Sequence, residues 1–141
     1  MTKYEHVEEL LRNYKMFKIN IRNIESEIEF IKNDIGVNGV DYTGISVSPT
    51  NVIKSATETK ALRMIEEVER LEKEVSVNQK VIDKIDRTIN CLERTERIIV
   101  EEKYINSLQW WQVACKVGYG ERQCRRIRNN AINKLVVGVM V

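Results

Sequence analysis

Residues 109–130 read QWWQVACKVGYGERQCRRIRNN, and this stretch predicts two helices joined by a tight turn. When Trp110 is taken as the first residue of the motif, Ala114 supplies the small side chain needed where the two helices touch, and Gly118 is the glycine of the turn. The pattern is that of a helix-turn-helix. Its predicted core consists of Trp110, Val113, Ala114, Val117, Gly118, Tyr119, Cys124 and Ile127.

The outward face of the second helix is polar and cationic, which suits the major groove of double-stranded DNA. Arginine pairs well with guanine and asparagine with adenine, so the residues expected to reach base edges are Arg122, Arg125, Arg126 and Asn129. Glu121 would accept a hydrogen bond from a cytosine, or its negative charge would stabilise the positive N-terminal end of the helix.

Other polar side chains in this region are expected to hold the DNA backbone and fix the register of the protein on it. Arg128 and Lys134 lie more to the side and are predicted phosphate contacts, while Gln109 and Gln112 stand at the start of the first helix of the motif. The complete predicted DNA-binding set is Gln109, Gln112, Glu121, Arg122, Gln123, Arg125, Arg126, Arg128, Asn129 and Lys134.

The distribution of charge supports a nucleic-acid partner. The net charge of the 141 residues is only +2, but residues 104–141 hold six Lys/Arg against one acidic residue, Glu121. A basic end on a mildly acidic body is a common feature of nucleic-acid binders. An ordinary solvated face is the alternative on charge alone.

The N-terminal part predicts a long amphipathic helix. Thr2 and Glu5 form a capping box that starts it at Lys3, and Gly36 and Gly39 are expected to end it. Apolar residues alternate in steps of three and four, which defines a heptad seam. The seam runs through Val7, Leu10, Tyr14, Phe17, Ile21, Ile24, Ile28, Ile31 and Ile35.

Residues 36–54 contain three glycines and the single proline, and they predict a connecting loop. Ser55 and Glu58 form a second capping box, which would open the next long helix. Its seam runs through Ala61, Met64, Val68, Leu71, Val75, Asn78, Ile82, Ile85, Ile89 and Leu92. Asn78 interrupts this seam. It either fixes the register or oligomeric state of the helices, or it lies at a solvent-exposed edge of the seam.

The expected fold is all-α, with a long antiparallel coiled-coil-like helical hairpin over residues 1–94 and a three-helix helix-turn-helix domain over residues 95–141. The three helices are predicted at 95–104, 108–117 and 121–135, the second capped by Ser107 and the third by Gly120. The apolar tail, residues 136–141, folds back or pairs with another chain. The apolar seams of the two long helices are expected to pack against each other, or to pack against a second copy of the chain and form a homo-oligomer.

Other kinds of function have little support. The sequence has no Gly-rich phosphate loop, no nucleophile elbow and no His/Cys/acid cluster at metal spacing, so neither an enzyme nor a cofactor nor a metal is expected. His6 is treated as a surface residue. Three cysteines without a CxxC pair, a start charged from Lys3 onward and no apolar run near the roughly 20 residues of a membrane span favour a cytoplasmic protein without a membrane partner.

Residues from about Ile85 to Leu135 resemble the C-terminal part of the ArpU/RinA-type phage transcriptional regulators and are similar to region 4 of sigma factors. The matching features are Tyr104 at the end of one helix, Trp110 opening the next, Val113-Ala114 within it, a Gly-Tyr turn and a final Ala-Ile-x-Lys-Leu. The resemblance implies a phage- or prophage-encoded regulator, with RNA polymerase as a further partner. One departure is Gly120, since a serine or threonine usually caps this recognition helix.

Two other functions fit the same pattern. A phage terminase small subunit also joins a helix-turn-helix to coiled-coil helices, and assembly into a ring would favour it. A coiled-coil adaptor, in which the C-terminal unit binds protein, would not need the arginine face formed by Arg122, Arg125 and Arg126.

Overall fold

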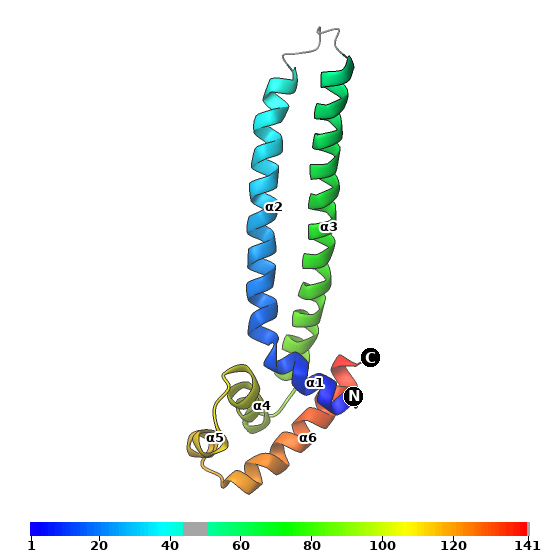
Figure 1. The fold of residues 1–141 in the computed structure, drawn as a ribbon. Coiled ribbons are helices and arrows are strands. Elements are labelled where there is room, and N and C mark those ends of the chain that lie inside the picture. Colours follow the sequence, from blue (N-terminus) through cyan, green and yellow to red (C-terminus); the bar gives the residue numbers. More distant parts are fainter. Residues whose placement is uncertain (44–50, 141) are drawn as a thin grey trace. The chain divides into compact units, whose positions relative to one another are not determined.

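The computed structural model describes the backbone of residues 1–43 and 51–140 and the side chains of residues 1–34 and 58–140, and every regular element in this part of the chain is helical (Figure 1). The predicted all-α fold class is therefore confirmed. The elements are α1 (Lys3–Arg12), α2 (Tyr14–Thr43), α3 (Asn51–Asn90), α4 (Arg94–Val100), the π-helix η1 (Glu101–Ile105), α5 (Trp110–Val117) and α6 (Glu121–Val139).

The N-terminal helix is divided in two at Asn13, whereas the sequence predicted one continuous helix. The capping box of Thr2 and Glu5 is present, but the backbone leaves helical geometry at Asn13, where φ is −90° and ψ is 2°, and α1 ends there. Asparagine readily leaves helical geometry because its side chain competes for backbone hydrogen bonds. The break changes which residues are covered: Leu11 is buried, while the seam residue Leu10 is only half-buried.

The connection between the long helices is shorter than the sequence predicted. Helix α2 continues past Gly36 and Gly39 to Thr43, and α3 begins at Asn51 rather than at Ser55, so both the loop 36–54 and the second capping box were wrong as helix boundaries. A glycine inside a helix costs only about 1 kcal/mol, which neighbouring turns can offset. Residues 44–50 of the predicted loop, and the side chain at the seam position Ile35, lie outside what the structure describes.

The chain forms two compact units, and one of them comprises residues 19–78. Within it, α2 and α3 lie side by side (Figure 1) and bury a cluster drawn from both predicted seams. The cluster consists of Ile24, Ile28, Ile31, Val68 and Leu71, with Met64 and Val75 packed against it. An ion pair of 3.1 Å between Lys32 Nζ and Glu72 Oε1 links the same two helices beside this cluster.

The other unit combines residues 1–18 with residues 79–141. Helix α6 packs against α1, α4 and α5, and α1 also contacts η1. The sequence placed residues 1–94 together and assigned only 95–141 to the C-terminal domain. The difference arises because α1 contributes Val7 and Leu11, each 1% exposed, to the core around the C-terminal helices.

The end of α6 belongs to this unit. The helix runs to Val139, four residues beyond the predicted end at Leu135, and Val139 is itself buried. The position of Gly138 shows how closely this end approaches α3, since a Cβ built there would meet Thr88 Cγ2 at 2.5 Å and Thr88 Oγ1 at 2.9 Å. Val139, in the predicted apolar tail, thus packs within its own chain.

Replacing Gly138 by alanine should destabilise the protein by about 1–2 kcal/mol, because overpacking outweighs the better helix propensity of alanine. Thr88 cannot easily turn away, since its hydroxyl donates to the Lys84 carbonyl at 2.7 Å. Urea denaturation would measure the effect. The double variant Gly138→Ala/Thr88→Ala should recover most of the loss, and a double variant no more stable than Gly138→Ala would contradict this contact.

Within the described ranges, no helix combines the length and the apolar character needed to cross a membrane. In the same residues, no three His, Cys, Asp or Glu side chains gather closely enough to hold a metal ion.

Candidate nucleic-acid interface

The turn between α5 and α6 consists of residues 118–120. Gly118 has φ 79° and ψ 16°, a left-handed conformation that an L side chain adopts only with strain, and its N–H donates to the Ala114 carbonyl at 2.9 Å. Gly120 is the N-cap of α6, as predicted, with Glu121 in the first turn. The two glycines therefore set the point at which α5 stops and α6 begins.

The start of α5 differs from the prediction. Its N-cap is Gln109, two residues after Ser107, which has a positive φ of 57°. The backbone N–H of Gln109 donates to Gln112 Oε1 at 2.9 Å, and Trp111 Nε1 donates to Gln109 Oε1 at 3.2 Å. Both glutamine side chains were expected to help hold a DNA backbone. Their oxygens instead accept hydrogen bonds at the N-terminus of α5.

A closed apolar core joins α4, α5 and α6. Ile99, Val113 and Cys124 are fully buried, and Leu108, Trp110, Ala114, Val117 and Ile127 pack against them. Burial raises the pKa of the Cys124 thiol, with a smaller contribution from the charge of Glu121. Tyr119 was predicted to belong to this core but is 48% exposed, because it stands in the turn after Gly118 rather than on an apolar helix face.

The outer face of the first half of α6 carries exposed polar side chains: Glu121, Arg122, Gln123 and Arg126. Arg122 and Arg126, one helical turn apart, form no hydrogen bond, ion pair or ring contact with the described residues. Their guanidinium groups are therefore available to an external ligand.

Arg125 and Asn129 are exposed but already make contacts. The guanidinium of Arg125 lies over the Trp110 ring, 5.5 Å from its centroid. Asn129 Oδ1 accepts from Tyr4 Oη and from Arg128 Nε, both at 2.8 Å. The amide nitrogen of Asn129 forms no hydrogen bond with the described residues, so pairing with adenine through both amide atoms would require only that Tyr4 and Arg128 release the oxygen.

Arg128 points into the protein rather than along the exposed face. Its side chain is only 20% exposed, donates to Tyr104 Oη at 3.1 Å and approaches Glu8 Oε2 to 3.9 Å. Tyr104 in turn donates to Glu8 Oε2 at 2.7 Å. Burial, together with this hydrogen bond to Glu8, raises the pKa of Tyr104 far above its ordinary value, so the phenol stays protonated. This network fastens α1 to η1 and α6.

Replacing Arg128 by alanine should therefore lower the free energy of unfolding by about 1–3 kcal/mol, since it removes the hydrogen bond to Tyr104, the ion pair with Glu8 and the contact over the Trp110 ring. Thermal or urea denaturation would measure this. Arg126→Ala, two residues earlier on the exposed face, is the matched control and should change stability by no more than about 0.5 kcal/mol. Equal stability of the two variants would show that the network contributes nothing.

Lys134, the other predicted phosphate contact, donates through Nζ to Glu96 Oε1 at 2.8 Å. Its side chain is nevertheless 55% exposed, and the hydrogen bond to Glu96 raises its pKa. The structure thus divides the predicted set. Arg122 and Arg126 have no partner among the described residues, Arg125 and Asn129 are exposed with internal contacts, and Arg128 and Lys134 are held by carboxylates of the same unit.

Sequence reasoning missed Tyr4 and Glu8, which reach the side chains of α6 and η1. Residues 4 and 129 are 125 positions apart, and no local pattern connects them. The only hint was that Tyr4 and Glu8 stand one helical turn apart beside the apolar residues Val7 and Leu11.

The structure defines an all-helical protein in which a short helix, a glycine turn and a basic helix share one core. The chain belongs to the family described as "Protein of unknown function (DUF722)", which it matches over residues 3–136. Neither the curated proteins nor the solved structures give a match to this chain.

Proposed function

We propose that this protein is a sequence-specific transcriptional regulator, encoded by a phage or prophage, that reads the major groove of double-stranded DNA with α6. The observation that carries the proposal is the pair of guanidinium groups of Arg122 and Arg126, which no described residue pairs with, on the exposed face of a helix whose opposite face is closed by core packing. The resemblance of residues 85–135 to ArpU/RinA-type regulators and to sigma region 4 supports the same function.

The spacing along α6 suits base recognition. Residues 122, 126 and 129 lie on one face, following the i, i+4, i+7 pattern. At 1.5 Å per residue, the segment from 122 to 129 covers about 10 Å, the rise of about three DNA base pairs. Arg122 and Arg126 are thus proposed to contact base edges, with Asn129 completing the face.

The remaining predicted contacts take supporting positions. Arg125, stacked on Trp110, is proposed to hold a phosphate at the side of the groove, because a guanidinium already ordered on a ring loses less freedom on binding. Arg128 and Lys134 contribute to the architecture of α6 instead. Glu121 favours the N-terminus of α6 as an acid in the first turn.

The unit formed by residues 19–78 is proposed to mediate self-association or contact with RNA polymerase. Its two-helix layer leaves large apolar side chains in water: Phe30 is 71% exposed, Leu62 57% and Ile65 44%. Exposed apolar surface of this kind marks interaction sites when it is contiguous. Sedimentation of the intact protein would show whether a second copy covers it.

Selection from a pool of random duplexes, at low and at moderate salt, tests the proposed function directly. Enrichment of one motif, with half-sites about one helical turn apart if the protein is a dimer, is the expected result. Affinity should fall steeply with salt, because phosphate neutralisation releases counterions. Salt-sensitive binding without an enriched motif would contradict sequence-specific regulation, and absence of binding at both salt concentrations would contradict any DNA role.

A further inference from the structure

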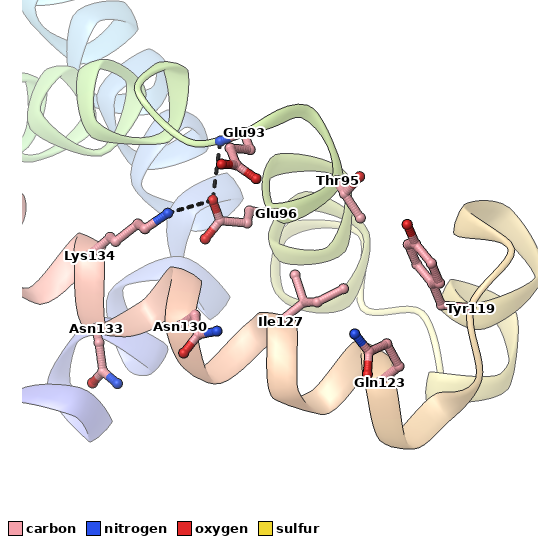
Figure 2. Close-up of a pocket in the computed structure, with 9 residues that line it drawn as sticks. All are labelled: Glu93, Thr95, Glu96, Tyr119, Gln123, Ile127, Asn130, Asn133 and Lys134. Carbon is pink, nitrogen blue, oxygen red and sulfur yellow. Dashed lines mark hydrogen bonds and ion pairs between the residues drawn. The ribbon is translucent and has the colours of Figure 1, made fainter.

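A polar pocket of about 510 Å³ lies between the first turn of α4 and one face of α6. Figure 2 shows side chains from both helices around it, with Glu96 pointing from α4 toward α6 and Tyr119 at the other end. The pocket is lined by Glu93, Thr95, Glu96, Tyr119, Gln123, Ile127, Asn130, Asn133 and Lys134. Neither Arg122 nor Arg126 lines it, so this surface is separate from the free guanidinium groups of the proposed DNA interface.

Glu96 is the unusual member of this lining, because it is an acid only 5% exposed. Its Oε1 accepts from Lys134 Nζ at 2.8 Å and from the backbone N–H of Glu93 at 3.3 Å. Its Oε2 is buried and finds no hydrogen-bond donor among the described residues. Buried carboxylate oxygens are normally satisfied, so half of this group's accepting capacity is unused.

Lys134 satisfies the site only partly. An ammonium is a point charge that reaches one oxygen here, and the Lys134 side chain is 55% exposed and attached to the pocket by that single contact. A guanidinium presents two parallel N–H groups at the spacing of the two oxygens of a carboxylate. A guanidinium in the place of the Lys134 ammonium would give both Glu96 oxygens a donor once the carboxylate turns its buried Oε2 toward the pocket.

We propose that this pocket receives an arginine side chain of a protein partner, whose guanidinium displaces the Lys134 ammonium and pairs with both oxygens of Glu96. Displacement moves Lys134 toward solvent, and the reorientation of the Glu96 carboxylate brings its buried Oε2 into the pocket. The ligand class is thus a peptide segment that carries an arginine.

The rest of the lining suits a peptide rather than a nucleic acid. Glu93 and Glu96 outnumber Lys134, so the pocket disfavours a phosphate group. The amides of Gln123, Asn130 and Asn133 are exposed and form no hydrogen bond with the described residues, and both donors and acceptors for a peptide backbone are therefore present. Ile127 and the half-exposed Tyr119 ring provide apolar area beside them.

Backbone amide NMR of the intact protein would test the site, with N-acetyl-arginine N-methylamide as the probe. The expected result is saturable shifts at residues 93–96 and 130–134 with a Kd on the order of millimolar, as suits one charge-assisted pair. The citrulline analogue has the same shape without the charge, and it should produce no saturable shift at these positions.

Two variants and one control complete the test. Glu96→Gln keeps an acceptor for Lys134 but should abolish the response to the probe. Lys134→Ala removes the competing ammonium and should tighten binding by about threefold to tenfold, since the free site no longer has to release an internal partner. Glu69→Gln, an exposed acid of α3, should bind as the unaltered protein does.

The proposal is overturned if no saturable shift occurs up to roughly tens of millimolar probe, a range that includes the weakest affinity expected of one such pair. It is also overturned if the citrulline analogue binds equally well, or if Glu96→Gln binds the probe while retaining the spectrum of a folded protein. Saturable shifts at these residues with adenosine monophosphate, but not with the arginine probe, would assign the pocket to nucleic acid instead. None of these outcomes depends on whether α6 binds DNA.

Discussion

Replacing Arg122 and Arg126 together by alanine is expected to remove sequence-specific DNA binding while leaving the fold intact. A good bidentate contact between arginine and a base contributes about 1–3 kcal/mol, so losing two should weaken binding to the selected site by roughly 30-fold to 10⁴-fold. Both side chains are exposed and form no hydrogen bond, ion pair or ring contact with the part of the chain that the structure describes, so the free energy of unfolding should change by no more than about 0.5 kcal/mol.

Fluorescence anisotropy with the selected duplex and with a scrambled duplex would measure the effect. The matched control is Arg22→Ala/Arg63→Ala, which removes the same charge from exposed positions of α2 and α3. If both double variants lose affinity equally, net charge explains the binding, and α6 does not read the groove.

The single variants separate base contacts from phosphate contacts. A base-reading arginine should relax the preference at one position of the motif when replaced by alanine. A phosphate-binding arginine should weaken binding to all sequences alike and reduce the salt slope by about 1. Arg125→Ala is expected to behave in the second way, because Trp110 holds its guanidinium at the side of the face.

The largest loss of stability is expected from Leu135→Ala. Leu135 is 0% exposed, and truncation of a fully buried leucine removes its packing and leaves a cavity, which costs about 2–5 kcal/mol. Calorimetry and urea denaturation should both show the loss. Because α6 is the helix on which α1, α4 and α5 pack, the defect should affect the whole unit formed by residues 1–18 and 79–141.

Val137→Ala is the control for this variant. Val137 stands two residues further along α6 and is 70% exposed, so its truncation should change stability by no more than about 0.5 kcal/mol. Similar midpoints for Leu135→Ala and Val137→Ala would show that the second half of α6 is not packed as described, and they would also remove support for the contact between Gly138 and Thr88.

The elements that could be predicted from the sequence are those fixed by local rules. The period of the apolar residues gave the long helices and the seam cluster of Ile24, Ile28 and Val68. Gly118 and Gly120 marked the turn because a left-handed residue and a helix cap each favour glycine or a small polar residue. The same rules failed at Ser107, Ser55 and Gly36. Several helix ends are possible near each of these residues, and their free energies differ by only about 1 kcal/mol or less.

The buried and exposed faces of α6 could be predicted in outline, but the contacts of its individual side chains could not. Helical periodicity separates the inner face of α6, with Cys124 and Ala131, from the outer face that carries Arg122 and Arg126. It cannot show which cation at the margin of the two faces meets an internal carboxylate. Arg128 and Lys134 were assigned to phosphates because they lie at the side of the outer face, and their carboxylate partners Glu8 and Glu96 could not be recognised because they come from distant parts of the chain.

The sequence by itself therefore determined the all-α class, the two seams, the glycine turn and the cationic outer face of α6, since each depends on residues within a few positions of one another. Only the tertiary structure decided that α1 separates at Asn13 and packs on α6, that Tyr119 leaves the core, and that Glu96 is buried with one oxygen unpaired. The packing of α1 on α6 and the contact between Lys134 and Glu96 join residues dozens of positions apart, and such contacts are set by the packing of whole helices rather than by the period of any one of them.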